Sequence, residues 1–114
     1  MSRFVERLHI TIENDHVFVN NVYFCRAGIG KDRERLKPLH GEARTEYSHT
    51  FHKVMVKVDG LGLIGAEDTC DVVLGNVRGP DGVIPCQATA ERLVYFVDQA
   101  ETYGRTATVE VTYA

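Results

Sequence analysis

The sequence predicts one α+β domain: an antiparallel β-sheet with an N-terminal hairpin or meander, then one C-terminal amphipathic helix and a short β tail. Polar and apolar residues alternate through the first quarter of the chain, which is the period of half-buried strands. Residues 89–103 change to a helical period, and residues 106–113 are again rich in β-branched side chains. A chain of 114 residues suits one core, so we expect a single domain over 1–114.

The N-terminal strands are separated by turn residues. Residues 7–13 alternate polar and apolar side chains and end at Asn14–Asp15, a pair that tolerates left-handed backbone. The β-rich runs 16–19 and 22–25 flank Asn20–Asn21, which suits a two-residue hairpin turn. The first quarter of the chain is therefore predicted to be an antiparallel meander of two or three strands.

The middle of the chain contains a long segment without periodicity and then the clearest strand. Residues 26–47 combine glycines with charges of alternating sign, so we expect a long, mostly exposed connection there, with one helical turn or a short edge strand as the alternatives within it. Residues 49–59 alternate strictly, which predicts a strand with a buried valine face and a solvated lysine face. The lysine face carries Phe51, Lys53, Met55 and Lys57, and the valine face carries His52, Val54, Val56 and Val58.

The second half of the chain supplies the remaining elements. Gly60–Gly65 is apolar, and we expect a flexible loop or a short strand that would be costly to leave exposed unless a partner covers it. Residues 69–78 predict a strand that ends at the turn sequence Gly79–Gly82, and residues 83–85 a brief extended segment.

The C-terminal helix is predicted over residues 89–103. Thr89 suits its N-cap and Gly104 the position just beyond its end. The apolar positions at helical spacing are Ala90, Leu93, Val94, Val97 and Ala100.

Charge is distributed unevenly along the chain. Residues 1–58 carry 10 Lys/Arg against 7 Asp/Glu, and residues 59–114 carry 3 against 9, so a net charge of −3 divides into +3 and −6. We expect one basic and one acidic surface, which would suit nucleic acid or head-to-tail docking of copies; two ordinary solvated faces are the alternative.

Cysteine usage and the N-terminal residues bear on the compartment. Cys25, Cys70 and Cys86 are odd in number and form no C-x-x-C pair, which predicts buried thiols rather than a metal or disulfide centre. The N-terminal residues contain no apolar run of signal-peptide length. We therefore expect assembly in a reducing cytoplasm, with no cofactor, no metal and no membrane partner.

The histidines are the main candidates for enzyme chemistry. His9-Ile10-Thr11 matches one half of the paired His-x-Thr motif of two-histidine phosphodiesterases, which need a second such motif for acid and base. None occurs at His16, His40, His49 or His52, and strand alternation places 49 and 52 on opposite faces. The sequence therefore favours a protein that is not an enzyme and has no catalytic residues.

Three stretches carry a resemblance to a known family. They are a lysine-bearing strand (His52–Asp59), a passage from a strand through small residues into a helix (Val83–Leu93) and a β-rich tail (Val109–Tyr113). In this order they resemble the coat proteins of single-stranded RNA bacteriophages. The resemblance implies a self-assembling capsid protein, located in the virion, that forms homodimers and binds RNA.

The resemblance also implies roles for particular residues. Lys53 and Lys57, with His49 at the start of the same strand, would contact RNA. The helix would cross onto a partner subunit's sheet, because one helix leaves part of a sheet uncovered. The implied dimer interface consists of Leu93, Val94 and Val97.

Two other classes of function stay open. The first is a small accessory or inhibitor protein that binds another protein through its charged segment. The second is a small hydrolase or phosphodiesterase that uses His9 or the histidines at 40–52.

Overall fold

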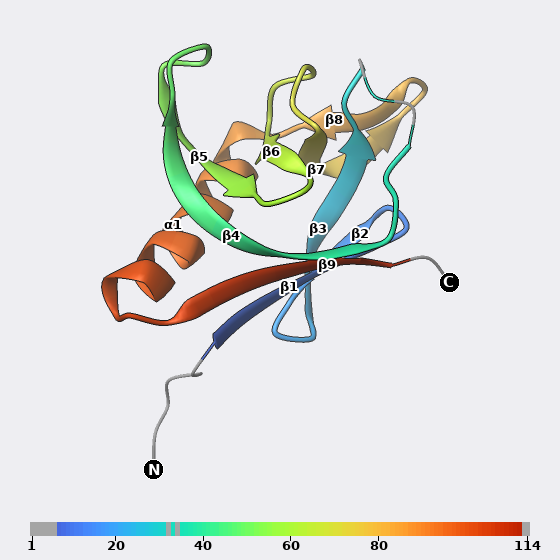
Figure 1. Ribbon diagram of the computed structural model, residues 1–114. Coiled ribbons are helices and arrows are strands. Elements are labelled where there is room, and N and C mark those ends of the chain that lie inside the picture. Colours follow the sequence, from blue (N-terminus) through green and yellow to red (C-terminus); the bar gives the residue numbers. More distant parts are fainter. Residues whose placement is uncertain (1–6, 32, 34, 113–114) are drawn as a thin grey trace.

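The computed structural model describes residues 7–31, 33 and 35–112. These residues form a closed eight-stranded β-barrel with one helix and one further strand outside the barrel wall (Figure 1). The elements are β1 (Arg7–Glu13), β2 (His16–Val19), β3 (Val22–Ile29), β4 (Leu39–Ser48), β5 (Lys53–Val58), β6 (Gly62–Gly65), β7 (Val72–Gly79), β8 (Gly82–Pro85), α1 (Gln87–Thr102) and β9 (Thr106–Thr112).

The barrel closes because β3 and β7, the two ends of the row of eight strands, pair with each other. The strand order is β3-β2-β1-β9-β4-β5-β6-β7, and β7 pairs with β3 to complete the ring, while β8 pairs with β7 outside it. β1 with β9 and β6 with β7 are parallel pairs, and the others are antiparallel. The predicted α+β fold with an open antiparallel sheet is therefore wrong, although β1, β2 and β3 do form an antiparallel meander. Hydrophobic period does not specify which distant strand a strand pairs with, and in β5 it also misplaced part of the buried face: Met55 is buried, whereas Val54 is 48% exposed.

Two strands differ from the prediction most clearly. β4 covers Leu39–Ser48, most of which lies in the segment 26–47 that the sequence predicts to be a connection with at most a short edge strand; the strand has ten residues and pairs on both sides, with β5 and β9. Its inward positions include Gly41, Ala43 and Thr45, and of these only Ala43 is buried, so the strand has almost no apolar alternation. β9 is not a tail at the edge of a sheet: it lies between β1 and β4, and Val109 is buried at its centre.

The predicted turns are confirmed. Asn14 (φ 56°), Asn20 (φ 49°) and Asn21 (φ 67°) adopt left-handed backbone in the two turns that join β1, β2 and β3. Asparagine tolerates this conformation better than most residues because its side chain bonds nearby backbone groups.

The predicted helix is confirmed, with a different start. Cys86 is the N-cap rather than Thr89, which lies inside the first turn, where its hydroxyl accepts a hydrogen bond from Asn76 Nδ2 (2.8 Å). Gly104 follows the helix with φ 68°, and its amide donates to the carbonyl of Glu101 (3.0 Å), as predicted for the position beyond the end.

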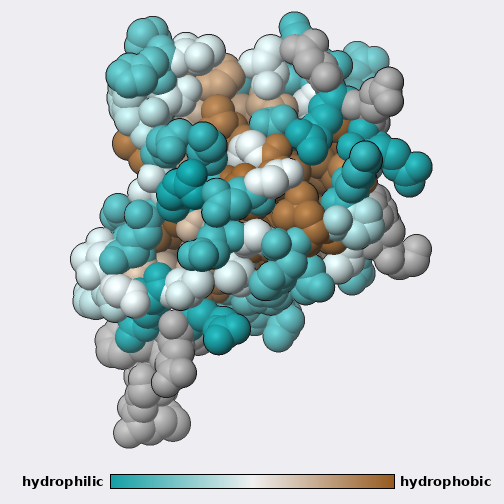
Figure 2. All heavy atoms as spheres, viewed as in Figure 1, coloured by the Kyte–Doolittle hydropathy of each residue, from teal (hydrophilic) through white to brown (hydrophobic). Residues whose placement is uncertain are grey.

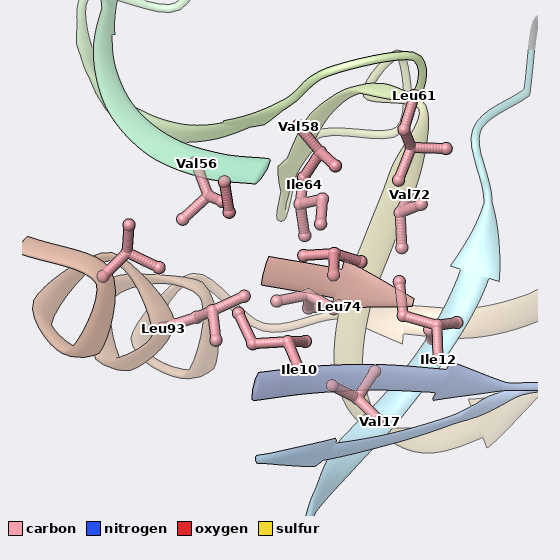
Figure 3. Packing of buried hydrophobic residues seen from close by; sticks show 14 of the residues in the cluster. Ile10, Ile12, Val17, Val56, Val58, Leu61, Ile64, Val72, Leu74 and Leu93 are labelled. Atoms are coloured by element: carbon pink, nitrogen blue, oxygen red, sulfur yellow. The ribbon is translucent and has the colours of Figure 1, made fainter. Parts of the chain in front are cut away.

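The core is aliphatic. Side chains from the strands and α1 meet inside the barrel, and Ile10, Val56, Leu74 and Leu93 are among the fully buried ones (Figure 3). No Phe or Tyr in the part of the chain that the structure describes is buried. The aromatic residues outside the core are Phe18, Tyr23, Phe24, Tyr47, Phe51, Tyr95, Phe96 and Tyr103.

Helix α1 packs against its own barrel. It contacts β1, β4, β5, β6, β7 and β9, and its Leu93 and Val97 belong to the core cluster. We expected the sheet to need a helix from a second copy because an open sheet would be left partly uncovered. The sheet instead closes on itself, and the chain's own helix packs into the core, so that reason no longer holds. Gly60–Gly65 contains the short strand β6, as one of the two predicted alternatives has it, and it is covered within the chain, because Leu61 and Ile64 are buried. The expected need for a partner to cover this segment is therefore wrong.

The side of the barrel away from α1 is covered by the connection between β3 and β4 (Figure 1). Leu36 is buried there in the core cluster, and Arg33 donates to Asp71 Oδ1 (2.8 Å). Hydrophobic atoms are visible at the centre of the face drawn in Figure 2, framed by hydrophilic side chains.

Candidate functional site

The outer side of α1 carries a shallow groove of about 370 Å³. We call it the aromatic groove, and its lining residues are Ala88, Glu91, Arg92, Tyr95 and Phe96. Their three- and four-residue spacing places them along one stripe of the helix. The buried stripe, which includes Leu93 and Val97, faces the barrel, so the groove lies on a helix that the core holds in place.

The rings of the aromatic groove contact β3. Phe96 meets Phe24 of β3 edge to face, with ring centroids 5.9 Å apart, and Tyr95 lies 6.2 Å from Phe96. The guanidinium carbon of Arg92 lies 5.1 Å from the centre of the Phe24 ring, within cation–π range. Tyr95 is 59% exposed, so much of this aromatic surface is open to solvent.

The β3 strand next to the groove has one unpaired edge. Over Val22–Cys25, the segment that we call the β3 edge, β3 pairs only with β2 among the described strands, because its pairing with β7 begins at Arg26. β7 leaves β3 at this point: its pairing with β8 starts at Gly75 and contains an irregularity there. Val22 and Tyr23 are 68% and 51% exposed.

Arg92 supplies the positive charge of the groove. Within the described residues its guanidinium has the Phe24 ring as a neighbour and no carboxylate in an ion pair. Glu91 beside it accepts a hydrogen bond from Gln87 Nε2 (3.3 Å) on the same helix. The groove therefore combines apolar rings with a cation that can receive a carboxylate.

The thiols differ in protonation. Burial raises the pKa of Cys25 to about 12 and also raises the pKa of Cys70, so both stay neutral packing groups, as the sequence predicts. Cys86 is half-buried at the start of α1, and hydrogen bonds from the hydroxyl and backbone amide of Thr89 lower its pKa.

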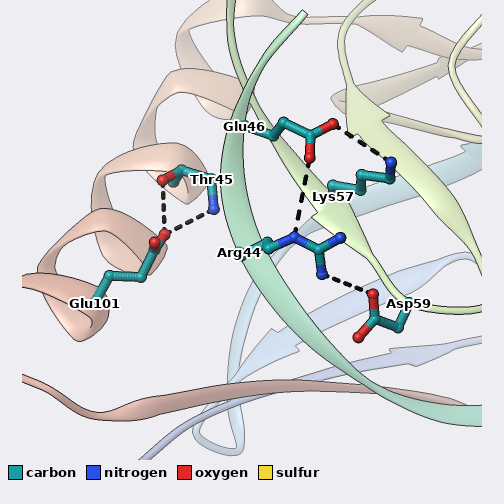
Figure 4. A network of polar contacts seen from close by, with 6 residues as sticks. All are labelled: Arg44, Thr45, Glu46, Lys57, Asp59 and Glu101. Atoms are coloured by element: carbon teal, nitrogen blue, oxygen red, sulfur yellow. Dashed lines mark hydrogen bonds and ion pairs between the residues drawn. The ribbon is translucent and has the colours of Figure 1, made fainter.

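The predicted RNA-binding residues do not form one cationic face. Lys53 Nζ donates to Glu67 Oε1 (2.8 Å) and to Gln87 Oε1 (3.3 Å). Lys57 Nζ lies 3.4 Å from Glu46 Oε2 in the network of Figure 4. His49 is exposed in the turn between β4 and β5, apart from these pairs. Each lysine charge is already balanced by a carboxylate, so the geometry gives little support to phosphate binding at this strand.

The opposite net charges of the two halves of the chain are largely paired with each other in the fold. Basic side chains of the first half form ion pairs with acidic side chains of the second, and these pairs remove much of the expected split into a basic and an acidic surface. The pairs are Lys31–Asp68, Arg33–Asp71, Arg44–Asp59 and Lys53–Glu67.

The predicted dimer-interface residues lie against their own barrel. Leu93 and Val97 are 1% and 0% exposed, and Val94 is half-buried next to the core cluster. Leu93 and Val97 therefore present no surface to a second copy.

The histidines do not gather into one site. His9 has Nδ1 2.9 Å from Thr108 Oγ1 and Nε2 3.4 Å from Glu110 Oε1, and the ring of His40 lies 6.2 Å away. His49 and His52 are in the turn after β4. Within the described residues no group of three or more His, Cys, Asp or Glu side chains could hold a metal ion.

A second cavity, of about 430 Å³, lies by the β7–β8 hairpin. Its polar lining is engaged internally: Asp15 pairs with Arg26 and Arg78, and Lys31 lies 4.0 Å from Asp68. Because these charges neutralise one another, they give a ligand little to bind.

Comparison with models of protein families, with curated proteins and with solved structures found no match to this chain. No helix within residues 7–31, 33 and 35–112 is long and apolar enough to cross a membrane.

The sequence interpretation missed the aromatic groove. The signal was present, because Tyr95 and Phe96 fall outside the buried stripe of the predicted helix and share a face with Arg92. Large aromatic residues on the otherwise polar side of an amphipathic helix are unusual in a protein with no binding surface. No sequence pattern indicated the unpaired β3 edge, because that edge exists only where β7 stops pairing with β3 and pairs with β8 instead.

Proposed function

We propose that this protein is a binding module for another polypeptide, with the aromatic groove as its docking surface. The observation that carries the proposal is the placement of the aromatic residues: no described Phe or Tyr is fully buried, Phe24 and Phe96 pack against the core with part of their surface exposed, and Tyr95 beside them is 59% exposed. Aromatic side chains gain the most from burial, so leaving each of them at least partly exposed forgoes stability that the fold had available. Tyr, Phe and Arg are also the residue types enriched at protein interfaces.

The groove has the properties of a preorganised binding surface. It combines Tyr95, Phe96 and Arg92 on a helix whose opposite stripe is fixed in the core. Tyrosine and arginine dominate binding hot spots, and a rigid helix loses little conformational freedom when a partner docks.

The other two hypotheses draw less support from this geometry. Coat-protein assembly through a shared helix would need Leu93 and Val97 on the surface, and RNA binding would need lysines without carboxylate partners. A hydrolase based on His9 would need a second catalytic group, while His9 is engaged by Thr108 and Glu110. Both stay predictions, and electron microscopy of the protein expressed alone would test the first by the presence of uniform particles.

The test is selection of a random seven-residue peptide library on the immobilised protein, followed by affinity measurement with the enriched synthetic peptide. We expect Tyr95→Ser to weaken binding about tenfold or more, as for a hot-spot residue. Tyr47→Ser is the matched control, because Tyr47 is 48% exposed on the β4–β5 hairpin. Failure to enrich any peptide, or loss of affinity in the control but not in Tyr95→Ser, would refute the proposal.

A further inference from the structure

We infer that the polypeptide partner binds as an added β-strand along the β3 edge, with one apolar side chain in the aromatic groove and a carboxylate at Arg92. This inference rests on the proposed function and specifies the partner's backbone conformation and chemistry. Three features of the molecule support it: the unpaired edge, the position of the groove beside it and the unpaired cation.

The β3 edge is exposed at Val22 and Tyr23, whereas Cys25 at its other end is buried. Val22–Cys25 has β2 as its only partner among the described strands. A strand edge presents unpaired N–H and C=O groups, and an extended peptide is the ligand that satisfies them. The edge therefore selects an extended backbone rather than a helix.

The sequence of the β3 edge lacks the usual protection against strand pairing. Val22-Tyr23-Phe24-Cys25 contains neither a charged residue nor a proline, and every residue in it suits a strand. The outer strand β8 provides a contrast within the same molecule, because it has four residues and ends at Pro85. Charges, prolines and short length are the means by which proteins block edge pairing. β8 uses two of them, whereas the β3 edge has neither charge nor proline; it is short, and its pairing with β2 is irregular between Val17 and Phe18.

The aromatic groove lies at the β3 edge. Phe24 belongs to this edge, and its ring contacts Phe96 and the Arg92 guanidinium. An added strand would lie about 4.8 Å from β3, with alternate side chains pointing to the same side. One apolar side chain of the peptide can then enter the groove beside Tyr95 while its backbone pairs with β3.

Arg92 offers a binding position for one carboxylate of the partner, beside Glu91, which is hydrogen-bonded to Gln87. Its guanidinium has no ion-pair partner within the described residues, and its planar donors match a carboxylate in bidentate geometry. The partner is therefore an extended segment that carries an aromatic or branched apolar residue close to Asp or Glu.

A second copy of this chain fits the site less well. An isologous dimer built from two β3 edges would pair only four residues on each side, whereas a stable interface buries about 800 Å² per partner. We therefore assign the site to a peptide segment.

The experiment uses the peptide enriched on the wild-type protein and synthetic versions with single backbone N-methyl groups. Strand addition predicts that methylation weakens binding at alternate residues, by about tenfold or more, because only every second amide faces β3. Hydrogen exchange of the amides in Val22–Cys25 is expected to slow when the peptide binds. Arg92→Glu is expected to reverse the preference from acidic to lysine-containing peptides, while Lys37→Glu, at an exposed site, leaves it unchanged.

The outcomes separate this inference from the proposed function. A peptide that needs Tyr95 but shows no alternation under N-methylation and no protection of the β3 edge would overturn strand addition and leave the binding module intact. An edge already protected in the free protein, together with a dimer in light scattering, would assign the edge to a second copy and overturn the peptide assignment. Failure of every peptide to bind would overturn both.

Discussion

The two faces of α1 use their side chains in opposite ways. The inward face buries the small and aliphatic residues Ala90, Leu93 and Val97, and the outward face leaves Tyr95 exposed and Phe96 half-buried. In most amphipathic helices the largest apolar side chains face the core. The reversal here indicates that stability and recognition reside on separate sides of one helix, so single substitutions can change either property alone.

The largest effect is expected on the inward face. Leu93→Ala removes a side chain that is 1% exposed inside the barrel, and the cavity should lower the free energy of unfolding by about 2–5 kcal/mol. Urea denaturation of this variant beside Val94→Ala, at the half-buried neighbouring position, gives the comparison. A loss below about 1 kcal/mol for Leu93→Ala would mean that the helix is not held by its inward face.

The second prediction compares the reactivity of two thiols, that of Cys25 inside the barrel and that of Cys86 at the start of α1. Cys86 has a lowered pKa, whereas Cys25 is buried with a pKa of about 12, so the thiolate fraction near neutral pH is much larger at Cys86. Iodoacetamide should alkylate Cys86 at least about 100-fold faster than Cys25. Peptide mass spectrometry over time measures the ratio, with Cys86→Ser as the control. Equal rates would show that the inner side of the barrel is open to the reagent.

A smaller effect is expected where α1 contacts the end of β4. Glu101 accepts hydrogen bonds from the backbone amide and hydroxyl of Thr45, at 2.7 and 2.6 Å (Figure 4). Glu101→Ala should lower the free energy of unfolding by about 0.5–1.5 kcal/mol, because the amide and hydroxyl of Thr45 lose the carboxylate that accepts their hydrogen bonds and must bind water instead. Asp98→Ala, at an exposed position one turn earlier, should change it by less than about 0.5 kcal/mol. Equal losses in the two variants would rule out a specific contribution from Glu101.

The smallest effect on stability is expected on the outward face. Tyr95→Ala removes an exposed ring and should change the free energy of unfolding by less than about 0.5 kcal/mol, although the same position is expected to be critical for binding. Thermal unfolding of this variant measures it. A loss comparable to that of Leu93→Ala would show that the aromatic face contributes to the fold itself.

Local chemistry made part of the fold predictable. The asparagine turns at Asn14 and Asn20–Asn21, the span of the helix and Gly104 beyond its end follow from the preferences of those residues alone. β4 was not predicted because Gly41 and Thr45 lie at its inward positions. The sequence of β4 therefore lacks the apolar alternation that identifies a strand. The closed barrel was not predicted either, because the pairing of β3 with β7, which completes the ring, and that of β1 with β9 join strands far apart in the chain, and no local pattern encodes them.

The candidate site was less predictable than the fold. The lysine face was inferred from Lys53 and Lys57 alone, but their partners Glu67 and Glu46 come from segments whose positions the sequence did not reveal. A charge is available for recognition only if the fold leaves it unpaired, and that depends on the neighbouring strands.

The central claim is that an extended polypeptide binds between the outward face of α1 and the β3 edge. The most direct measurement is a titration of ¹⁵N-labelled protein with the selected peptide, followed by amide chemical shifts. We expect the perturbed amides to cluster at Val22–Cys25 and residues 88–96, with residues 30–38 and the β4–β5 hairpin unchanged. Perturbations centred on residues 30–38 or on that hairpin, with residues 88–96 unaffected, would contradict the account.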